Sequence, residues 1–447
     1  MQATKKQPVN QSNLLEKVFK LSENNTNVKT EIIAGLTTFM TMAYILAVNS
    51  SMLSEAGMDP GAVFVATALS ATLSTLVMAF LSNYPIALAP GMGLNAFFAY
   101  TVVLQMGYSW QMALLGVFIE GILFIILTVT NLREQIINCI PNVLKNAVTA
   151  GVGLFIAAIG LTNSGLISMQ TGTLSLGSMH EPLVLLTVAG LVIASILVCR
   201  NVKGALLISI LLTSVIGMIT GIIAFPAQIF SLNVPSLKPT FMQAFSVPMD
   251  QVFSLDMLIV IFTFLFMDLF NTVGFLVGVA SKGNLIDEEG KIPKAKQAML
   301  ADAIGTTIGA LLGTSTVTCY MESSAGISEG GKTGLTALTV AVLFILSLFL
   351  APLFISIPSQ ATGAALIVVG VMMANCFREI NFEDYTDAIP AFLTFILMPL
   401  TNSVADGIIF GVVSYTILKL VTNKKEEVNI SLIVLTIIFI CRYLFLK

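Results

Sequence analysis

The sequence predicts an all-α polytopic membrane protein with about 14 membrane-spanning segments in two inverted repeats of about seven. Hydrophobic residues make up 56% of the 447 positions and charged residues only 10%, which is more apolar than a water-soluble chain of this size. Apolar stretches of helical length recur along the chain, and two of them are interrupted by Gly, Pro, Ser and Thr. An odd number of spans per half makes the second half inverted relative to the first.

The first part of the chain contains a polar tail and the first repeat. Residues 1–29 are Lys-rich and lack the apolar region of a signal peptide, with a short amphipathic helix expected around 14–21. The first repeat covers 30–224, and its spans are expected at 30–52, 61–82, 85–104, 110–130, 140–164, 181–199 and 203–224.

A Pro-rich polar loop at 225–256 separates the two repeats. The second repeat covers 257–421, with spans expected at 257–280, 295–312, 314–329, 334–356, 360–376, 386–401 and 403–421. The C-terminal segment 422–447 carries an additional hydrophobic helix at 430–445, and the sequence leaves open whether that helix crosses the membrane.

Basic residues support this layout and predict the orientation. With the N-terminus in the cytoplasm, nearly all of them fall in inside loops, and Lys238 is the clear exception. The inside set is Arg133, Lys145, Arg200, Lys203, Lys282, Lys291, Lys294, Lys296, Lys332, Arg378, Lys424 and Lys425. We therefore expect a multi-pass membrane protein with its N-terminus in the cytoplasm.

The third and tenth spans are the interrupted ones. They read PIALAPGMGLNAFFAY and TSTVTCYMESSAGISEGG, and both are short of bulky aliphatic side chains. Interrupted segments at corresponding positions of two halves indicate a midplane site built from broken helices. Non-helical backbone at that depth is tolerated where protein or a cavity satisfies its polar groups.

Two carboxylates, Asp268 and Glu322, lie in segments that belong at membrane depth. An ionised Asp at the centre of a span costs roughly 2.5 to 3.5 kcal/mol, and such residues mark substrate or proton pathways. Burial disfavours the charged form, so both are candidate proton carriers and candidate acceptors for the N–H edge of a heterocycle. The alternatives are a structural Glu bonded to freed amides and an Asp paired with a Lys.

Neutral groups near these carboxylates complete the candidate site. Thr272 lies one helical turn after Asp268, and Asn271 is beside it. Asn95 follows the Pro-Gly-Met-Gly break and precedes Phe97 and Phe98, so an amide and aromatic faces are available to hold a flat polar ring. Asn95 is equally typical of a helix cap.

Three further residues have weaker indications. Thr41 is a candidate contact, although threonines in such helices more often bond to their own backbone. Glu120 is ionisable and mid-span, and structural and relay roles are both open. Asp302 lies near Lys294 and Lys296, which favours an ion pair or a gate latch.

Nothing in the sequence indicates an enzyme. No phosphate-binding loop or nucleophile–base arrangement occurs, and the single His180 and five scattered cysteines offer no metal spacing. We expect no catalytic residues, no metal, no organic cofactor and no nucleic-acid partner.

Four motifs together resemble the AzgA-like purine permeases, a branch of the nucleobase–cation symporters that include the xanthine/uracil permeases. The motifs are TEIIAGLTTFMTMAYILAVN, PIALAPGMGLNAFFAY, FLFMDLFNTVGFLVG and GTSTVTCYMESSAGISEGGKTGL, in one order from about residue 30 to residue 443. The branch usually reads DLFDT where this chain reads DLFNT, so Asn271 removes a charge near the site. Uracil permeases carry a His at the position of Thr272, so a His-dependent coupling is not expected here.

The resemblance implies a core domain (spans 1–4 and 8–11) moving against a gate domain (spans 5–7 and 12–14), with short strands in the third and tenth spans. It implies proton-coupled import of adenine, guanine or hypoxanthine through the lipid bilayer of the bacterial cytoplasmic membrane, with Glu322 and Asp268 holding the purine and the proton. A homodimer is compatible with it. The alternatives are an anion or pyrimidine/xanthine carrier of related fold and, less favoured, a channel.

Overall fold

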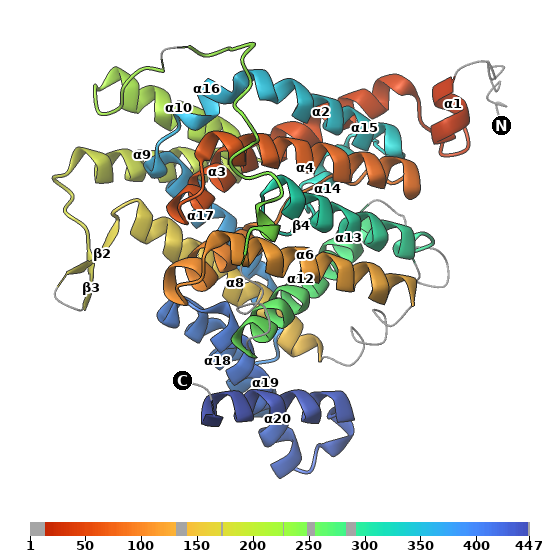
Figure 1. The fold of residues 1–447 in the computed structure, drawn as a ribbon, viewed down its shortest axis with the longest axis vertical. Helices are drawn as coiled ribbons and strands as arrows, with labels where there is room; N and C mark the ends of the chain where they lie inside the picture. Colours follow the sequence, from red (N-terminus) through yellow and green to blue (C-terminus); the bar gives the residue numbers. More distant parts are fainter. Residues whose placement is uncertain are drawn as a thin grey trace.

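The computed structural model describes residues 14–130, 141–170, 173–226, 228–247, 255–282 and 292–445. Arg133 and Lys291, which contribute to the predicted orientation, lie outside these ranges, as do the first 13 residues of the tail. Figure 1 shows α1 (Leu14–Phe19) at one edge of the molecule and the hairpin of β2 (Ile167–Gln170) and β3 (Thr173–Leu176) at the opposite edge. We call these edges the α1 end and the hairpin end; the long helices run between them.

The first half follows the expected spans closely. Its remaining elements are α2 (Val28–Met42), α3 (Ile45–Glu55), α4 (Pro60–Leu81), β1 (Leu88–Pro90), α5 (Met92–Ala96), the π-helical η1 (Phe97–Gln105), α6 (Trp110–Val129), α8 (Asn142–Asn163), α9 (Pro182–Cys199) and α10 (Ala205–Ile219). The expected span 30–52 is broken in the structure, because a turn at Ala43 and Tyr44 separates α2 from α3.

The second half repeats this order after a short 3-10 turn, η2 (Gln243–Phe245). Its elements are α12 (Leu255–Lys282), α13 (Ala295–Leu312), β4 (Val317–Cys319), α14 (Ser323–Ser328), α15 (Gly334–Ser347), η3 (Leu348–Leu350), α16 (Ala351–Ile355), α17 (Ser359–Met373), η4 (Ala374–Glu379), α18 (Tyr385–Thr401), α19 (Val404–Val421), η5 (Lys425–Glu427) and α20 (Ile430–Phe445). Within the described ranges, 8 helices or helix pairs are long and apolar enough to cross a membrane, and shorter apolar helices accompany them.

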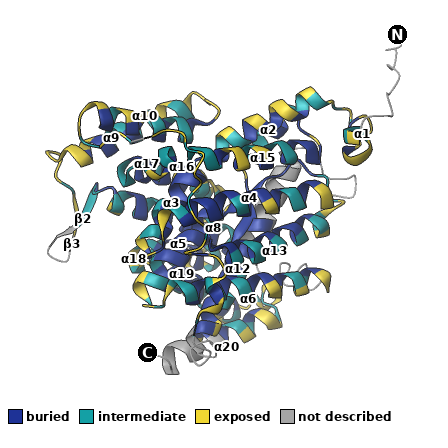
Figure 2. Ribbon diagram, turned by 45° about the horizontal axis from the view of Figure 1, so that its top comes forward, coloured by how far each residue is buried: buried dark blue, intermediate teal, exposed yellow. Residues whose placement is uncertain are grey.

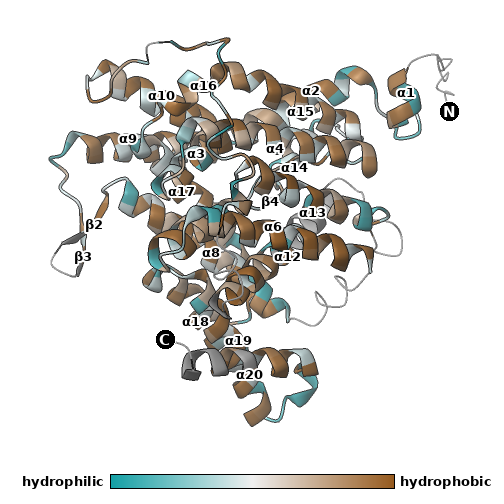
Figure 3. Cartoon of the chain, viewed as in Figure 1, coloured by the Kyte–Doolittle hydropathy of each residue, from teal (hydrophilic) through white to brown (hydrophobic). Residues whose placement is uncertain are grey.

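Polar side chains cap the N-termini of several of these helices. Asn27 accepts from the Thr30 N–H at 3.0 Å before α2, and Asp59 accepts from the Ala62 N–H at 2.7 Å before α4. Such caps satisfy amides that have no partner inside the helix. The outward faces are apolar, as Figure 3 shows for α9 and α10, where Ile196 is 50% and Ile219 74% exposed. Exposed apolar faces of this extent suit a lipid environment.

The two broken spans meet each other, which confirms the prediction that they are interrupted. β1 pairs antiparallel with β4, with Ala89 opposite Thr318. Backbone bonds extend the pairing at both ends, from the Gly91 N–H to Thr316 O at 3.0 Å and from the Tyr320 N–H to Ala87 O at 3.0 Å. The pairing satisfies amides that the broken helices leave unbonded at depth.

The helix packing has the symmetry of two related halves. α4 packs on α15 as α13 packs on α6, and α9 packs on α17 as α18 packs on α8. Two bundles result: the core bundle (α2–α6, α12–α16 and the strands β1 and β4) and the gate bundle (α8–α10 and α17–α19). Figure 2 shows buried residues concentrated in the middle of the molecule, where the bundles meet.

Small residues let the fifth and twelfth spans of the gate bundle cross closely. A methyl placed on Gly160 of α8 would lie 2.6 Å from the Gly363 carbonyl oxygen, and one on Gly363 of α17 would lie 2.9 Å from the Gly160 oxygen. Close backbone approach through small residues is how membrane helices gain packing energy without a hydrophobic driving force.

The additional helix α20 packs along the outside of α19. The Thr436 hydroxyl donates to the Thr416 hydroxyl oxygen at 2.9 Å, and the Phe439 ring meets Phe262 of α12 edge-on with centroids 6.0 Å apart. Figure 1 shows α20 at one margin of the molecule, running in the direction of the long helices. α20 therefore touches both bundles.

Candidate functional site

Glu322 lies in the turn that connects β4 to α14, and it is half-buried. Its Oε1 accepts a hydrogen bond from the Tyr44 hydroxyl at 2.7 Å. Tyr44 occupies the break between α2 and α3 and is 2% exposed. A polar side chain at the break in the first span therefore hydrogen-bonds a residue at the break in the tenth span.

Asp268 belongs to a second cluster that joins three elements. It is fully buried on α12, and the Thr272 hydroxyl one turn later lies 3.1 Å from its Oδ1. The same hydroxyl oxygen lies 2.8 Å from Oδ2 of Asp302 on α13 and 3.0 Å from the hydroxyl of Thr318 on β4. One threonine hydroxyl thus bridges two buried carboxyl groups.

Asp302 lies on α13, and its Oδ2 is 2.8 Å from the Thr272 hydroxyl oxygen. The Lys294 ammonium donates to Ser82 O at 3.0 Å, and the Lys296 ammonium donates to Val129 O at 3.1 Å. Asp302 is fully buried, so it belongs to the interior of the core bundle.

Asn95 and Glu120 both reach the segment that leads into β4. Asn95 is fully buried on α5, and its Oδ1 accepts from the Ser315 hydroxyl. Its Nδ2 has no hydrogen-bond partner in the part of the chain that the structure describes. Glu120 of α6 is fully buried, and its Oε2 accepts from the Thr316 hydroxyl at 2.8 Å.

The remaining candidates have packing contacts or bonds to backbone oxygens. The Phe97 ring packs edge-on against Phe264 with centroids 4.8 Å apart, and Phe98 is fully buried in the core. The Thr41 hydroxyl lies 2.8 Å from Thr38 O of its own helix and 3.5 Å from Glu322 O. Asn271 is 6% exposed on α12.

Sequence reasoning missed the hydroxyl run before β4 and two tyrosines. Each hydroxyl of this run hydrogen-bonds a different polar side chain. The pairs are Thr314 with Asn49, Ser315 with Asn95, Thr316 with Glu120 and Thr318 with Thr272. Tyr320 donates to Pro90 O at 2.6 Å, and Tyr44 donates to Glu322. The sequence feature that could have indicated these contacts is the density of hydroxyl side chains in TSTVT, residues 314–318.

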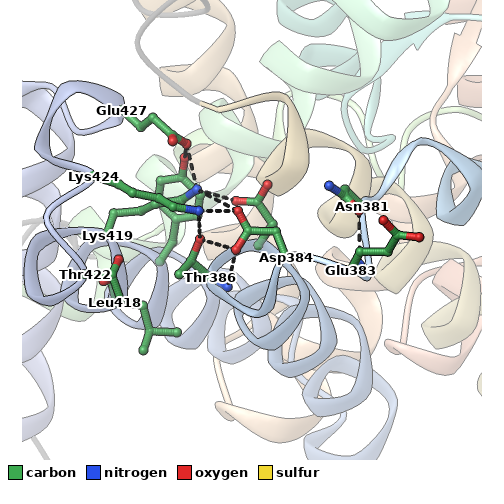
Figure 4. A network of polar contacts seen from close by, with 11 residues as sticks. Asn381, Glu383, Asp384, Thr386, Leu418, Lys419, Thr422, Lys424 and Glu427 are labelled. Atoms are coloured by element: carbon green, nitrogen blue, oxygen red, sulfur yellow. Dashed lines mark hydrogen bonds and ion pairs between the residues drawn. The ribbon is translucent and has the colours of Figure 1, made fainter.

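A separate charged network lies at the α1 end of the gate bundle (Figure 4). The Lys419 ammonium is 1% exposed and lies 2.8 Å from Asp387 and 2.6 Å from Glu427. Lys424 pairs with Asp384, which caps α18. This network joins α18, α19 and η5 and has no contact with the Glu322 cluster among the hydrogen bonds of the described residues.

Polar contacts connect the two bundles at both ends. At the hairpin end, Asn163 of α8 donates to Glu55 at 2.9 Å and to the Tyr100 hydroxyl at 2.7 Å, and Gln105 donates to Thr401 O at 2.8 Å. At the α1 end, Lys203 of the gate bundle pairs with Glu329 of the core bundle.

Comparisons with known proteins agree with this architecture. A model of the permease family matches residues 29–410. The chain is 46% identical over 439 residues to the guanine/hypoxanthine permease PbuG of Bacillus subtilis, covering 96% of this chain and 99% of PbuG. It is 41% identical over 435 residues to the adenine permease AdeP of Escherichia coli, covering 97% of this chain and 96% of AdeP.

Among solved structures, the transmembrane domain of a cyanobacterium bicarbonate transporter, BicA, superposes with a TM-score of 0.63. The superposition covers 85% of this chain and 97% of the BicA domain, and the two are 16% identical in sequence. At this identity the similarity shows the fold alone.

Proposed function

Because this chain belongs to the permease family, we propose that it carries purine nucleobases (adenine, guanine or hypoxanthine) into the cell together with protons. Its relatives named for purines cover nearly the whole chain. The observation that carries the mechanism is the pair of intramembrane carboxyl clusters, at Glu322 and at Asp268. β4 contributes Thr318 to the Asp268 cluster and leads into the turn that holds Glu322. The protein would lie in the cytoplasmic membrane with its N-terminus inside, and no cofactor would be needed.

The purine would bind between the two clusters. Glu322 is half-buried, and a carboxylate accepts hydrogen bonds from a ligand that presents N–H donors. Asn95 keeps an amide N–H₂ group for ring acceptors, since its Oδ1 already bonds Ser315. Donors and acceptors of this kind match the edges of a purine.

The proton would be held in the Asp268 cluster. The Thr272 hydroxyl has one proton and lies within 3.1 Å of Asp268 Oδ1 and 2.8 Å of Asp302 Oδ2, so it can donate to only one of them. A proton on the other carboxyl group would complete the network. Loading that proton would lower the cost of the buried charge.

An anion carrier is the runner-up, since bicarbonate transporter BicA shares the fold. The side chains described above around Glu322, Asp268 and Asn95 are carboxyl, amide and hydroxyl groups, none of which is a cation that would pair with an anion. A hydrogen-bonding base fits these groups better.

The proposal predicts that Glu322→Gln and Asp268→Asn each abolish concentrative purine uptake while the protein still reaches the membrane. Uptake of labelled adenine, guanine and hypoxanthine into cells that lack their own purine carriers measures this, with a protonophore to test the coupling. Glu181→Gln, at an exposed position before α9, is the matched control and should transport normally. Normal concentrative uptake in both site variants would contradict the proposal.

A further inference from the structure

Tyr44 is the one described side chain whose hydroxyl donates to the Glu322 carboxylate. It is 2% exposed, whereas Glu322 is half-buried and its neighbour Met321 is 39% exposed. The tyrosine therefore approaches the carboxylate from the protein side.

The break in the first span explains why Tyr44 can reach this position. The Ala43 N–H bonds Phe39 O at 2.8 Å and closes α2, while the Val48 N–H bonds Tyr44 O at 3.0 Å and opens α3. Tyr44 thus stands between two helices rather than on the face of one, and its side chain extends toward β4 and α14.

Close packing of α2 on α14 holds the two partners together. A methyl on Gly326 of α14 would lie 2.4 Å from Ala34 O and 2.1 Å from the Thr38 hydroxyl. No other residue type fits at this contact without moving α14. The separation between Tyr44 and Glu322 is therefore set by backbone packing.

A hydroxyl that donates to one carboxylate oxygen restricts the orientation of the whole group. With Oε1 held, the carboxylate has less rotational freedom, and Oε2 can accept from a ring N–H in fewer directions. An unheld glutamate has three rotatable bonds and would lose that entropy on binding.

We propose that Tyr44 is a positioning residue of the purine site, which orients the Glu322 carboxylate toward one N–H edge of the purine. This inference rests on the proposed function. It assigns Tyr44 a part in choosing among purines, because only a purine with a donor at the favoured position gains the bond to Oε2.

The test is a thermodynamic cycle between Tyr44 and the ligand. Purines methylated singly at N1, N3, N7 or N9 compete with the labelled purine for purified protein. For wild type, the methyl that blocks the N–H facing Glu322 should weaken binding roughly tenfold or more, as expected for a hydrogen bond to a charged group. In Tyr44→Phe, the unmethylated purine should bind roughly tenfold more weakly than it binds to wild type. The loss of affinity that the same methyl group causes in the variant should fall to under about threefold.

If the role of Tyr44 is purely structural, Tyr44→Phe weakens the binding of every purine by the same factor. The ratios between their affinities then stay unchanged, and that result would overturn the inference. Tyr84→Phe is the matched control, because the Tyr84 oxygen accepts from the Lys294 N–H at 3.1 Å, away from the site. If Tyr44→Phe does not fold, Tyr44→Leu, which also lacks the hydroxyl, replaces it with the same expectations. Absence of saturable purine binding by wild type would refute the proposed function itself, whereas wild-type binding with unchanged ratios in the variant refutes only the role of Tyr44.

Discussion

At the residue scale, the Thr272 hydroxyl joins three elements of the candidate site. Its hydroxyl oxygen lies within hydrogen-bond distance of Asp268, Asp302 and Thr318. The three partners come from α12, α13 and β4, so one side chain connects a continuous helix, its neighbour and the strand pair. The hydroxyl has one proton, so it can donate to only one of the two carboxyl groups at a time.

Thr272→Val should keep the fold and remove the shared donor. Because valine has nearly the same shape as threonine, the loss is one of hydrogen bonding, worth about 1.5 to 3 kcal/mol for bonds to charged groups. We expect purine uptake to fall roughly ten- to a hundredfold, with a changed pH dependence of uptake. Initial uptake rates from pH 5 to pH 8 measure both.

Thr263→Val is the matched control on the same helix. Thr263 is 6% exposed. Among the hydrogen bonds of the described residues, its hydroxyl bonds only to Ile259 O of its own helix, at 2.8 Å. Its loss should leave uptake within about twofold of wild type. An equal loss in both variants would show that Thr272 acts through helix packing alone.

At the element scale, the charged network of Figure 4 ties α18, α19 and η5 together through two lysines in unlike surroundings. Lys419 is 1% exposed, lies between Asp387 and Glu427, and stands over the Tyr415 ring at 5.2 Å from its centroid. Lys424 is 38% exposed and pairs with Asp384. Burial, rather than charge, distinguishes the two.

Lys419→Met should destabilise the protein by about 1 to 3 kcal/mol, because Asp387, whose side chain is only 15% exposed, loses the ammonium that lies 2.8 Å away. Lys424→Met should cost no more than about 1 kcal/mol, as is usual for accessible ion pairs. Thermal unfolding of the purified variants, followed side by side, compares the two. Equal losses would show that the exposed pair contributes as much as the buried one.

The Asp384–Lys424 pair also has a predicted pH dependence. The hydrogen bond from Lys424 holds the pKa of the Asp384 carboxyl below its ordinary value of 3.8. A depressed pKa means that the pair stabilises the fold above about pH 4 and loses that effect as the pH falls further. The stability difference between wild type and Lys424→Met should therefore shrink below about pH 4, in the same unfolding experiment.

At the scale of the whole molecule, the two bundles are joined at both ends by side chains that rocking would have to separate. Asn163 holds Glu55 and Tyr100 at the hairpin end, and Lys203 pairs with Glu329 at the α1 end. Alternating access requires each end to open while the other stays closed. These contacts are therefore expected to break in turn.

Cross-linking either end should stop transport. In a variant without native cysteines, Glu55→Cys with Asn163→Cys, bridged by a short thiol-reactive linker, should block purine uptake, and so should Lys203→Cys with Glu329→Cys. Cleavage of a reducible linker should restore it. The single-cysteine variants, treated in the same way, are the controls. Uptake that continues through both cross-linked pairs would favour a channel over a carrier.

Much of the fold could be predicted from the sequence because the membrane imposes simple rules on it. Apolar length, loop charge and the paired Gly/Pro interruptions led to the segments and to the broken third and tenth spans, which the structure pairs as β1 and β4. The break at Ala43 and Tyr44 was not predicted. No Gly or Pro occurs there, and tertiary packing rather than local propensity ends the helix.

The candidate site divides in the same way. The sequence by itself determined which residues are costly at membrane depth, since Asp268 and Glu322 are conspicuous among apolar neighbours. Only the tertiary structure decided their partners: Tyr44 for Glu322, and Thr272 with Asp302 for Asp268. Burial cost is a property of one residue in its own segment, whereas a hydrogen bond between residues up to 278 positions apart depends on how the two halves pack.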